Sequence, residues 1–149
     1  MATVLRATTE LVAATWLNTL FDQPIVATTL PKPADGTPVW ADTGFITVAV
    51  VGGGAGMYVP LRSPVVSVDC WAVNPQSAKP PWGKANNLAE TVQAACYGPI
   101  NMRLELPGGF PDVRALSAYS VSESRRITDD QSSYAHYSLD VQLHWVEAS

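Results

Sequence analysis

The segment from about Tyr134 to Glu147 alternates regularly between apolar and polar side chains, and this alternation constrains the fold more than any other feature. The apolar positions are Tyr137, Leu139, Val141, Leu143 and Trp145, and the polar positions are His136, Ser138, Asp140, Gln142 and His144. Successive side chains of a strand point to opposite faces, so a period of two predicts a long strand with one buried face. The chain must therefore contain a sheet with one apolar and one polar face.

Five further segments have the composition of strands. They lie at about 25–30, 45–51, 57–73, 100–106 and 113–123. The second and third are joined by Gly52-Gly53-Gly54-Ala55-Gly56, which predicts a hairpin tip. A phosphate-binding loop is excluded there, because no Lys-Ser/Thr pair follows and the glycine spacing is wrong. Pro60 and Pro64 suit a bent or edge strand.

Two segments predict helices, at about 8–20 and 83–97. In the first, Thr8 or Thr9 supplies a cap, and Ala13, Trp16, Leu17 and Leu20 form an apolar stripe. In the second, the expected stripe is Leu88, Val92, Ala95 and Cys96, and Gly98-Pro99 ends the helix. Both helices have one apolar side to place against the sheet.

The order of these elements predicts an α+β fold. We expect a mainly antiparallel sheet with two helices packed on one face, in a single domain spanning residues 1–149. Two segments lie outside the regular elements. The proline-rich stretch 31–43 predicts an extended loop or arm, and residues 124–133 predict a hairpin loop.

The chain is poor in charge. Asp, Glu, Lys and Arg make up 15% of its residues, against about 25% in an average protein, and the net charge is −4. This balance excludes a polybasic nucleic-acid binder, and the apolar content argues against disorder. A surface with few charges is typical of a protein that is partly covered by partners.

The residues that carry chemistry do not converge on a site. His136, Asp140 and His144 share a strand face, but four residues of strand span roughly 13 Å, whereas zinc ligands lie about 2.0–2.2 Å from one ion. Asp69 lies in an apolar strand as a candidate acid, or as an outward or contact residue. We therefore expect no catalytic residues, no cofactor and no metal.

Cys70 and Cys96 form no metal-binding or redox motif. We expect two buried, reduced thiols in a protein made in a reducing cytosol. The N-terminus lacks the apolar run of a signal peptide, and the uncharged stretch 43–61 is interrupted by glycines and a proline. No membrane segment is predicted.

Six residues are candidates for contacts with partners. Four of them, Arg125, Arg126, Asp129 and Asp130, form the densest group of charges, which is either a solvated loop tip or a contact element. The other two, Trp40 and Trp82, are flanked by loop-type residues, and are either interface anchors or residues packed at the edge of the core.

As a whole, the sequence resembles the tail-terminator (tail-completion) proteins of long-tailed bacteriophages. The likeness is carried by four segments in order: T-T-E-L-V-A-A-T-W-L near the start, P-V-V-S-V-D-C-W-A from Pro64 to Ala72, N-N-L-A-E-T-V-Q-A-A after it, and the closing Y-S-L-D-V-Q-L-H-W. The proline-rich arm and the Gly52–Gly56 loop do not align with the family.

The resemblance implies a structural virion protein without enzymatic activity. Such proteins close into rings, commonly six-fold, on the head-proximal end of the tail tube, where they end tube polymerisation and join the head. The implied partners are further copies of the chain, the major tail tube protein, head–tail connector proteins and DNA in transit through the lumen. The implied location is the virion tail, after assembly in the host cytoplasm. The alternatives are another head–tail joining or minor tail protein, or a small cytosolic α+β enzyme or ligand-binding domain that uses Asp69, His136 or His144.

Overall fold

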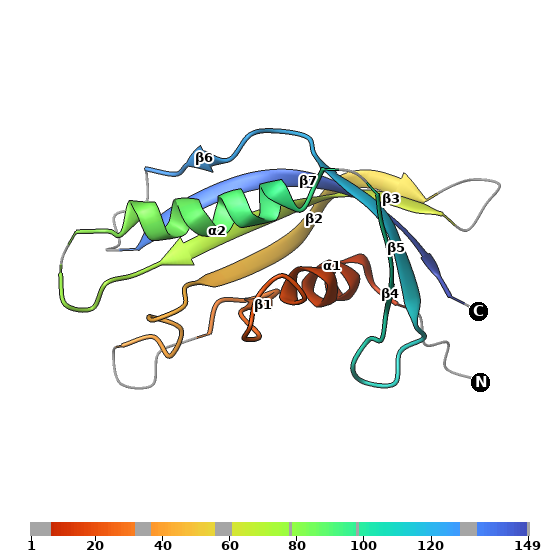
Figure 1. Cartoon of the computed structure of the whole chain (residues 1–149), viewed down its shortest axis with the longest axis horizontal. Helices are drawn as coiled ribbons and strands as arrows, with labels where there is room; N and C mark the ends of the chain where they lie inside the picture. The colour runs from red at the N-terminus through yellow and green to blue at the C-terminus, as the bar shows by residue number, and fades with distance from the viewer. Residues whose placement is uncertain are drawn as a thin grey trace.

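The computed structural model describes residues 7–31, 37–55, 61–77, 79–97, 99–128 and 134–148. Their elements, in chain order, are α1 (Thr9–Asn18), β1 (Val26–Ala27), β2 (Phe45–Ala55), β3 (Arg62–Ala72), α2 (Trp82–Ala94), β4 (Pro99–Leu104), β5 (Val113–Ser120), β6 (Arg125–Arg126) and β7 (Ala135–Glu147). Two helices and a strand-rich sheet make this an α+β structure, as the sequence predicts (Figure 1).

All the strands of this part of the chain belong to one sheet, with the order β1-β2-β3-β7-β5-β4 and with β6 paired to β7 beyond the end of β5. Every pair is antiparallel except β1 with β2. The long strands β3 and β7 lie in the middle and pair along most of their length. The expected mainly antiparallel sheet is therefore confirmed.

The core forms from alternate residues of the central strands. On β7, Leu139, Val141, Leu143 and Trp145 are buried, as the alternation predicts. The neighbouring strand β3 buries Val66, Val68 and Cys70 in the same cluster, together with residues of both helices. Burial of these apolar side chains is the main stabilising contribution to the fold.

Helix α1 begins where the sequence places it. The Thr8 hydroxyl accepts a hydrogen bond from the Leu11 backbone N–H at 3.3 Å, which satisfies one of the free donors of the first turn. At its other end, the side-chain Oδ1 of Asn18 accepts from the backbone N–H groups of Ile25 and Val26 at 3.0 and 3.1 Å. This side chain holds the short β1 strand beside β2. The predicted strand 25–30 is reduced to Val26–Ala27.

Helix α2 begins at Trp82 and ends at Ala94, slightly before the predicted end. It buries Ala85, Leu88, Ala89 and Val92. Near its start, Ala85 packs with Ala72 of β3 and Ala135 of β7. Three alanines at one place let the helix approach the strands closely.

The prediction that the glycine segment forms a hairpin tip is wrong for its described residues. Strand β2 continues through Gly52, Gly53 and Gly54, which pair with Val65, Pro64 and Ser63 of β3 after an irregularity that follows Val50. Gly53 has φ +80°, and a Cβ there would lie 2.3 Å from the Ser63 carbonyl oxygen. Glycine is required because the backbones approach this closely, so the residue type reflects a bulge within a strand rather than a tip. Gly56 lies outside the described residues.

The predicted arm 31–43 is also corrected for the part that the structure describes. Residues 37–43 form a turn, in which Ala41 N–H donates to Pro38 O at 3.1 Å and Gly44 N–H donates to Trp40 O at 2.8 Å. This turn buries the large indole of Trp40 in the core, which an extended arm would leave in water. Residues 32–36 lie outside the described residues.

The predicted hairpin loop 124–133 begins later than expected. Arg125 and Arg126 form β6 and pair with Ser138 and Tyr137 of β7. Ile127 N–H then donates to His136 O at 2.9 Å. The sequence did not predict this strand, because the side chains of an edge strand can all be exposed and polar, without an apolar pattern. Asp129 and Asp130 lie outside the described residues.

Candidate assembly surface

The outer side of β5 is open near its end. Strand β4 pairs with β5 only as far as Ser117, and beyond that point β5 continues to pair with β7 on its other side. Among the described residues, no strand covers the outer side of Ala118, Tyr119 and Ser120. Unpaired backbone N–H and C=O groups on such an edge can bind another strand.

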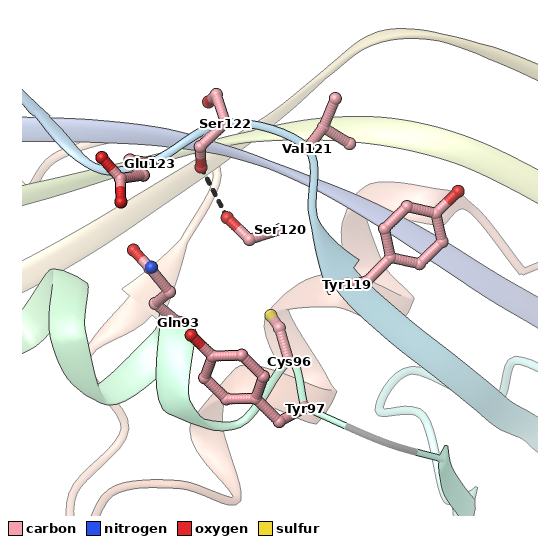
Figure 2. A pocket seen from close by; sticks show the side chains of 8 residues that line it. All are labelled: Gln93, Cys96, Tyr97, Tyr119, Ser120, Val121, Ser122 and Glu123. Atoms are coloured by element: carbon pink, nitrogen blue, oxygen red, sulfur yellow. Dashed lines mark hydrogen bonds between the residues drawn. The ribbon is translucent and has the colours of Figure 1, made fainter.

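A groove lies beside this open edge, between the end of α2 and the bend that follows β5 (Figure 2). It has a volume of about 390 Å³ and is lined by Gln93, Cys96, Tyr97, Tyr119, Ser120, Val121, Ser122 and Glu123. We call it the edge groove. Ser120 points toward α2, whereas Tyr119 and Val121 lie on the other side of the strand. Tyr97, Tyr119 and Val121 are large apolar residues that remain exposed.

Gln93 contributes an unsatisfied polar atom to the edge groove. Its amide extends from α2 toward Glu123 (Figure 2). Within the described parts of the chain, its Oε1 is buried and accepts no hydrogen bond. A buried acceptor without a partner is costly, so native structures usually supply a donor. The edge groove therefore combines a buried, unpaired acceptor with the exposed side chains of Tyr97 and Glu123.

The opposite edge of the sheet is open as well. Strand β1 covers β2 only at Ile46 and Thr47, and no other described strand pairs with the outer side of β2 beyond that point. Val50 and Val51 are exposed on this edge. The sheet thus has two different open edges, each with exposed apolar side chains.

The sheet face that carries the even residues of β7 holds a polar cluster. His136 Nε2 lies 2.8 Å from Asp69 Oδ1, and the imidazole stacks on the Trp71 ring with centroids 3.8 Å apart. The Trp71 indole N–H donates to Thr47 Oγ1 at 3.1 Å. Burial acts to raise the Asp69 pKa, but hydrogen bonds from His136 and Ser138 outweigh it, and the pKa is lowered. The sequence offered both Asp69 and His136 as candidates without pairing them.

A second polar pair lies on the same face. Ser117 Oγ and His144 Nδ1 are 3.2 Å apart, and the Tyr119 ring stacks on His144. His136 and His144 are separated by eight residues of strand, or roughly 26 Å at about 3.3 Å per residue. The Asp–His pair and the Ser–His pair therefore do not combine into a catalytic triad. No group of three metal-binding side chains occurs among the residues that the structure describes.

The structure places the six predicted contact residues as follows. Trp40 is buried against Phe45 and Tyr134, which favours core packing over an interface role. Trp82 is half-buried under Arg126, whose guanidinium carbon lies 4.0 Å from the ring centroid. Arg125 is exposed, with its guanidinium 3.9 Å from Asp140. Asp129 and Asp130 lie outside the described residues, and none of the other four residues lines the edge groove.

Both cysteines are buried and unpaired by a disulfide. Burial raises the pKa of the Cys70 thiol, with the charge of Asp69 adding to the effect, and raises the pKa of Cys96 to about 11. Thiols with raised pKa values are poor nucleophiles at neutral pH. Among the described residues, no helix has the length and apolar character needed to cross a membrane.

No protein-family model matches the chain, and no curated protein matches it.

Proposed function

We propose that this chain is a structural subunit that closes into a ring, of the kind that ends the tail tube of a long-tailed bacteriophage. The observation that carries the proposal is the presence of exposed apolar side chains on two different edges of one sheet. Val50 and Val51 mark one edge, and Tyr119 and Val121 mark the other. Two unlike surfaces on one subunit favour head-to-tail contacts, which generate rings when the rotation closes.

The low charge supports the same proposal. Only 15% of residues are charged, so both edges can be covered without removing many ions from water. A net charge of −4 also suits a ring around DNA in transit, because strong phosphate binding needs clustered Lys and Arg.

In this proposal the two helices pack on one face of the sheet. The partners are further copies of the chain, the tail tube protein and the head–tail connector, and the location is the virion tail.

A second candidate function is a small enzyme or ligand-binding domain that uses the Asp69–His136 pair. The 2.8 Å contact between these residues favours it, because a carboxylate can orient an imidazole for proton transfer. The cluster gives less support than the edges do. Nε2 of His136 contacts Asp69, and the serine beside Asp69, Ser67, donates to the same carboxylate rather than to the imidazole.

The ring is tested by imaging the purified chain in the electron microscope at low and high salt. The proposal predicts ring-shaped particles with a central hole at both salt concentrations, because apolar edge contacts are only weakly screened by salt. Micrographs that show only single subunits at both salt concentrations would contradict the proposal.

The role in the tail needs a separate test. Tube growth by the tail tube protein from the same source would be followed with and without the ring. The proposal predicts that tubes stop lengthening when the ring is added. Unchanged tube lengths would contradict the tail role and leave the ring itself intact.

A further inference from the structure

The two open edges lie at the same level of the sheet. Val50 of β2 pairs with Val66 of β3, Val66 pairs with Val141 of β7, and Val141 pairs with Ser120 of β5. These four residues form one row from edge to edge. Paired residues share a face, so the side chains of Val50 and Ser120 lie on the same face, the one where Val66 and Val141 are buried.

We propose that β2 of one subunit pairs with β5 of the next, with Val50 opposite Ser120 and the Val50 side chain in the edge groove. The inference rests on the proposed ring and specifies its contact. The occupant of the groove is a second copy of this chain, added by strand pairing at an open edge.

The direction of the strands supports this pairing. The three pairs that connect β2 to β5 are all antiparallel, so β2 and β5 themselves run in opposite directions. If a second copy lies beside the first in the plane of the sheet and in the same orientation, its β2 runs opposite to β5 of the first copy. The new pair is therefore antiparallel, like the pairs within the subunit, and the sheet continues from copy to copy.

The side chains on β2 select the register. A shift of two residues would place Val48 or Gly52 opposite Ser120. Val48 is 1% exposed and already fills its own core, and Gly52 has no side chain to insert. Val50 is 44% exposed on the same face as Val48 and is free to enter a groove.

The groove offers what an incoming strand needs. The Tyr97 ring, 78% exposed, supplies apolar surface beside the position of Val50. The unsatisfied Gln93 Oε1 is buried in the free subunit, and a turn of its amide on contact would let it accept a hydrogen bond from a donor of the incoming subunit. One arriving strand would thus cover an exposed aromatic side chain and pair a buried polar atom.

The register is tested by disulfide cross-linking. All variants carry Cys96→Ala, because Cys96 lines the groove and would compete for the new thiol. Val50→Cys and Ser120→Cys are purified as separate single variants, then mixed and oxidised. The Cα atoms of paired residues lie about 5.5 Å apart, within disulfide range. We expect a covalent dimer in the mixture and none in either variant alone, because the contact is head-to-tail.

The matched control replaces the neighbour of Val50 by Ala49→Cys. Ala49 pairs with Ser67 and so lies on the opposite face of the sheet. It should not cross-link to Ser120→Cys. Rings that form without the Val50–Ser120 cross-link, or that cross-link equally through Ala49, would overturn the register and leave the ring standing. A wild-type chain that forms no rings at all would overturn the proposed function itself.

A second pair of variants avoids the need for oxidation. Val50→Asp places a charge in the edge groove, and we expect it to abolish assembly while the subunit stays folded. Val39→Asp is the control, because Val39 is exposed but lies outside both the groove and the β2 edge. It should assemble as the wild type does. Equal assembly of the two variants would contradict the proposed contact.

Discussion

Val50 and Ser120 stand at opposite edges of the sheet on a single row of paired residues. Neither edge is covered at this level by another described strand, and both side chains lie on the buried face of the sheet. An open edge is a liability for a monomer, because it invites pairing with other chains. Two matched open edges on one subunit are useful if the subunit is built to join copies of itself.

Gln93 should affect assembly and subunit stability differently. Gln93→Leu removes a buried acceptor that has no partner within the described subunit, so the free energy of unfolding of the subunit should stay unchanged or rise by about 1 kcal/mol. Assembly should weaken, since the acceptor is lost from the contact. Denaturant unfolding and mass measurement would report the two effects separately.

Gln142→Leu is the matched control for Gln93. The Gln142 amide donates to Ser63 O at 3.2 Å and accepts from the Tyr119 hydroxyl. Its replacement should lower the free energy of unfolding, since two bonds are lost. A greater loss of stability in Gln93→Leu than in Gln142→Leu would contradict the account of the unpaired acceptor.

Gly53 should be the least replaceable residue of the glycine segment. Gly53→Ala forces a Cβ to within 2.3 Å of Ser63 O at φ +80°, so the free energy of unfolding should fall by about 1–3 kcal/mol. Gly52→Ala is the control, because its added Cβ would lie 3.9 Å from the nearest atom, in ordinary contact. Thermal unfolding should give a clearly lower midpoint temperature for Gly53→Ala than for Gly52→Ala. Equal midpoint temperatures would contradict the bulge at Gly53.

Asp69 should make stability depend on acid pH. Its folded-state pKa is lowered below 3.8, so its contribution to stability is fully present above pH 3.8 and is lost as the pH falls through the folded value. Asp69→Asn should cost about 1–2 kcal/mol at neutral pH and should flatten the loss of stability below pH 3.8. Unfolding measured from neutral pH into this acid range would show both effects.

Asp112→Asn serves as the control for Asp69. Asp112 pairs with Arg103 at 2.9 Å, but the Arg103 side chain is 50% exposed and the Asp112 side chain is 31% exposed. Exposed ion pairs contribute little, so this variant should stay close to the wild type at neutral pH. If it lost as much stability as Asp69→Asn, the polar cluster would have no special role.

Arg126 should matter more to the subunit than its neighbour Arg125. Arg126→Ala removes the guanidinium from the Trp82 ring and should lower the free energy of unfolding by about 0.5–1 kcal/mol. Arg125→Ala breaks only a 3.9 Å contact with Asp140 and should change it by less than about 0.5 kcal/mol. Chemical unfolding of both variants measures the two losses of free energy. A larger loss in Arg125→Ala than in Arg126→Ala would contradict this account of β6.

Much of the fold follows from local patterns. The faces of β7 and the cap of α1 could be predicted because they depend on residue period and on one hydroxyl close in sequence. Ser138 departs from its pattern: it occupies a polar position yet is 4% exposed. The strand β6 that pairs beside it has no apolar signature, so its presence could not be inferred from the sequence.

The candidate surface could not be predicted in the same way. Val50 and Ser120 are 70 positions apart, and their common row depends on the order of four strands. Tyr97 and Tyr119 gave only a weak signal, because an aromatic side chain at a helix end or on a polar face suits a core edge equally well. The sequence also left open whether Trp40 is an interface anchor or a core residue. The turn at 37–43 buries it in the core.

The central claim is that this chain closes into a ring, and a native mass measurement tests it most directly. The mass of the wild-type chain would be recorded over a wide range of protein concentrations. A closed ring predicts one dominant assembly of fixed mass, near six times the 15.9 kDa subunit for a six-fold ring, which does not grow at higher concentration. A chain that stays at the subunit mass throughout, or a series that lengthens without limit, would contradict the claim.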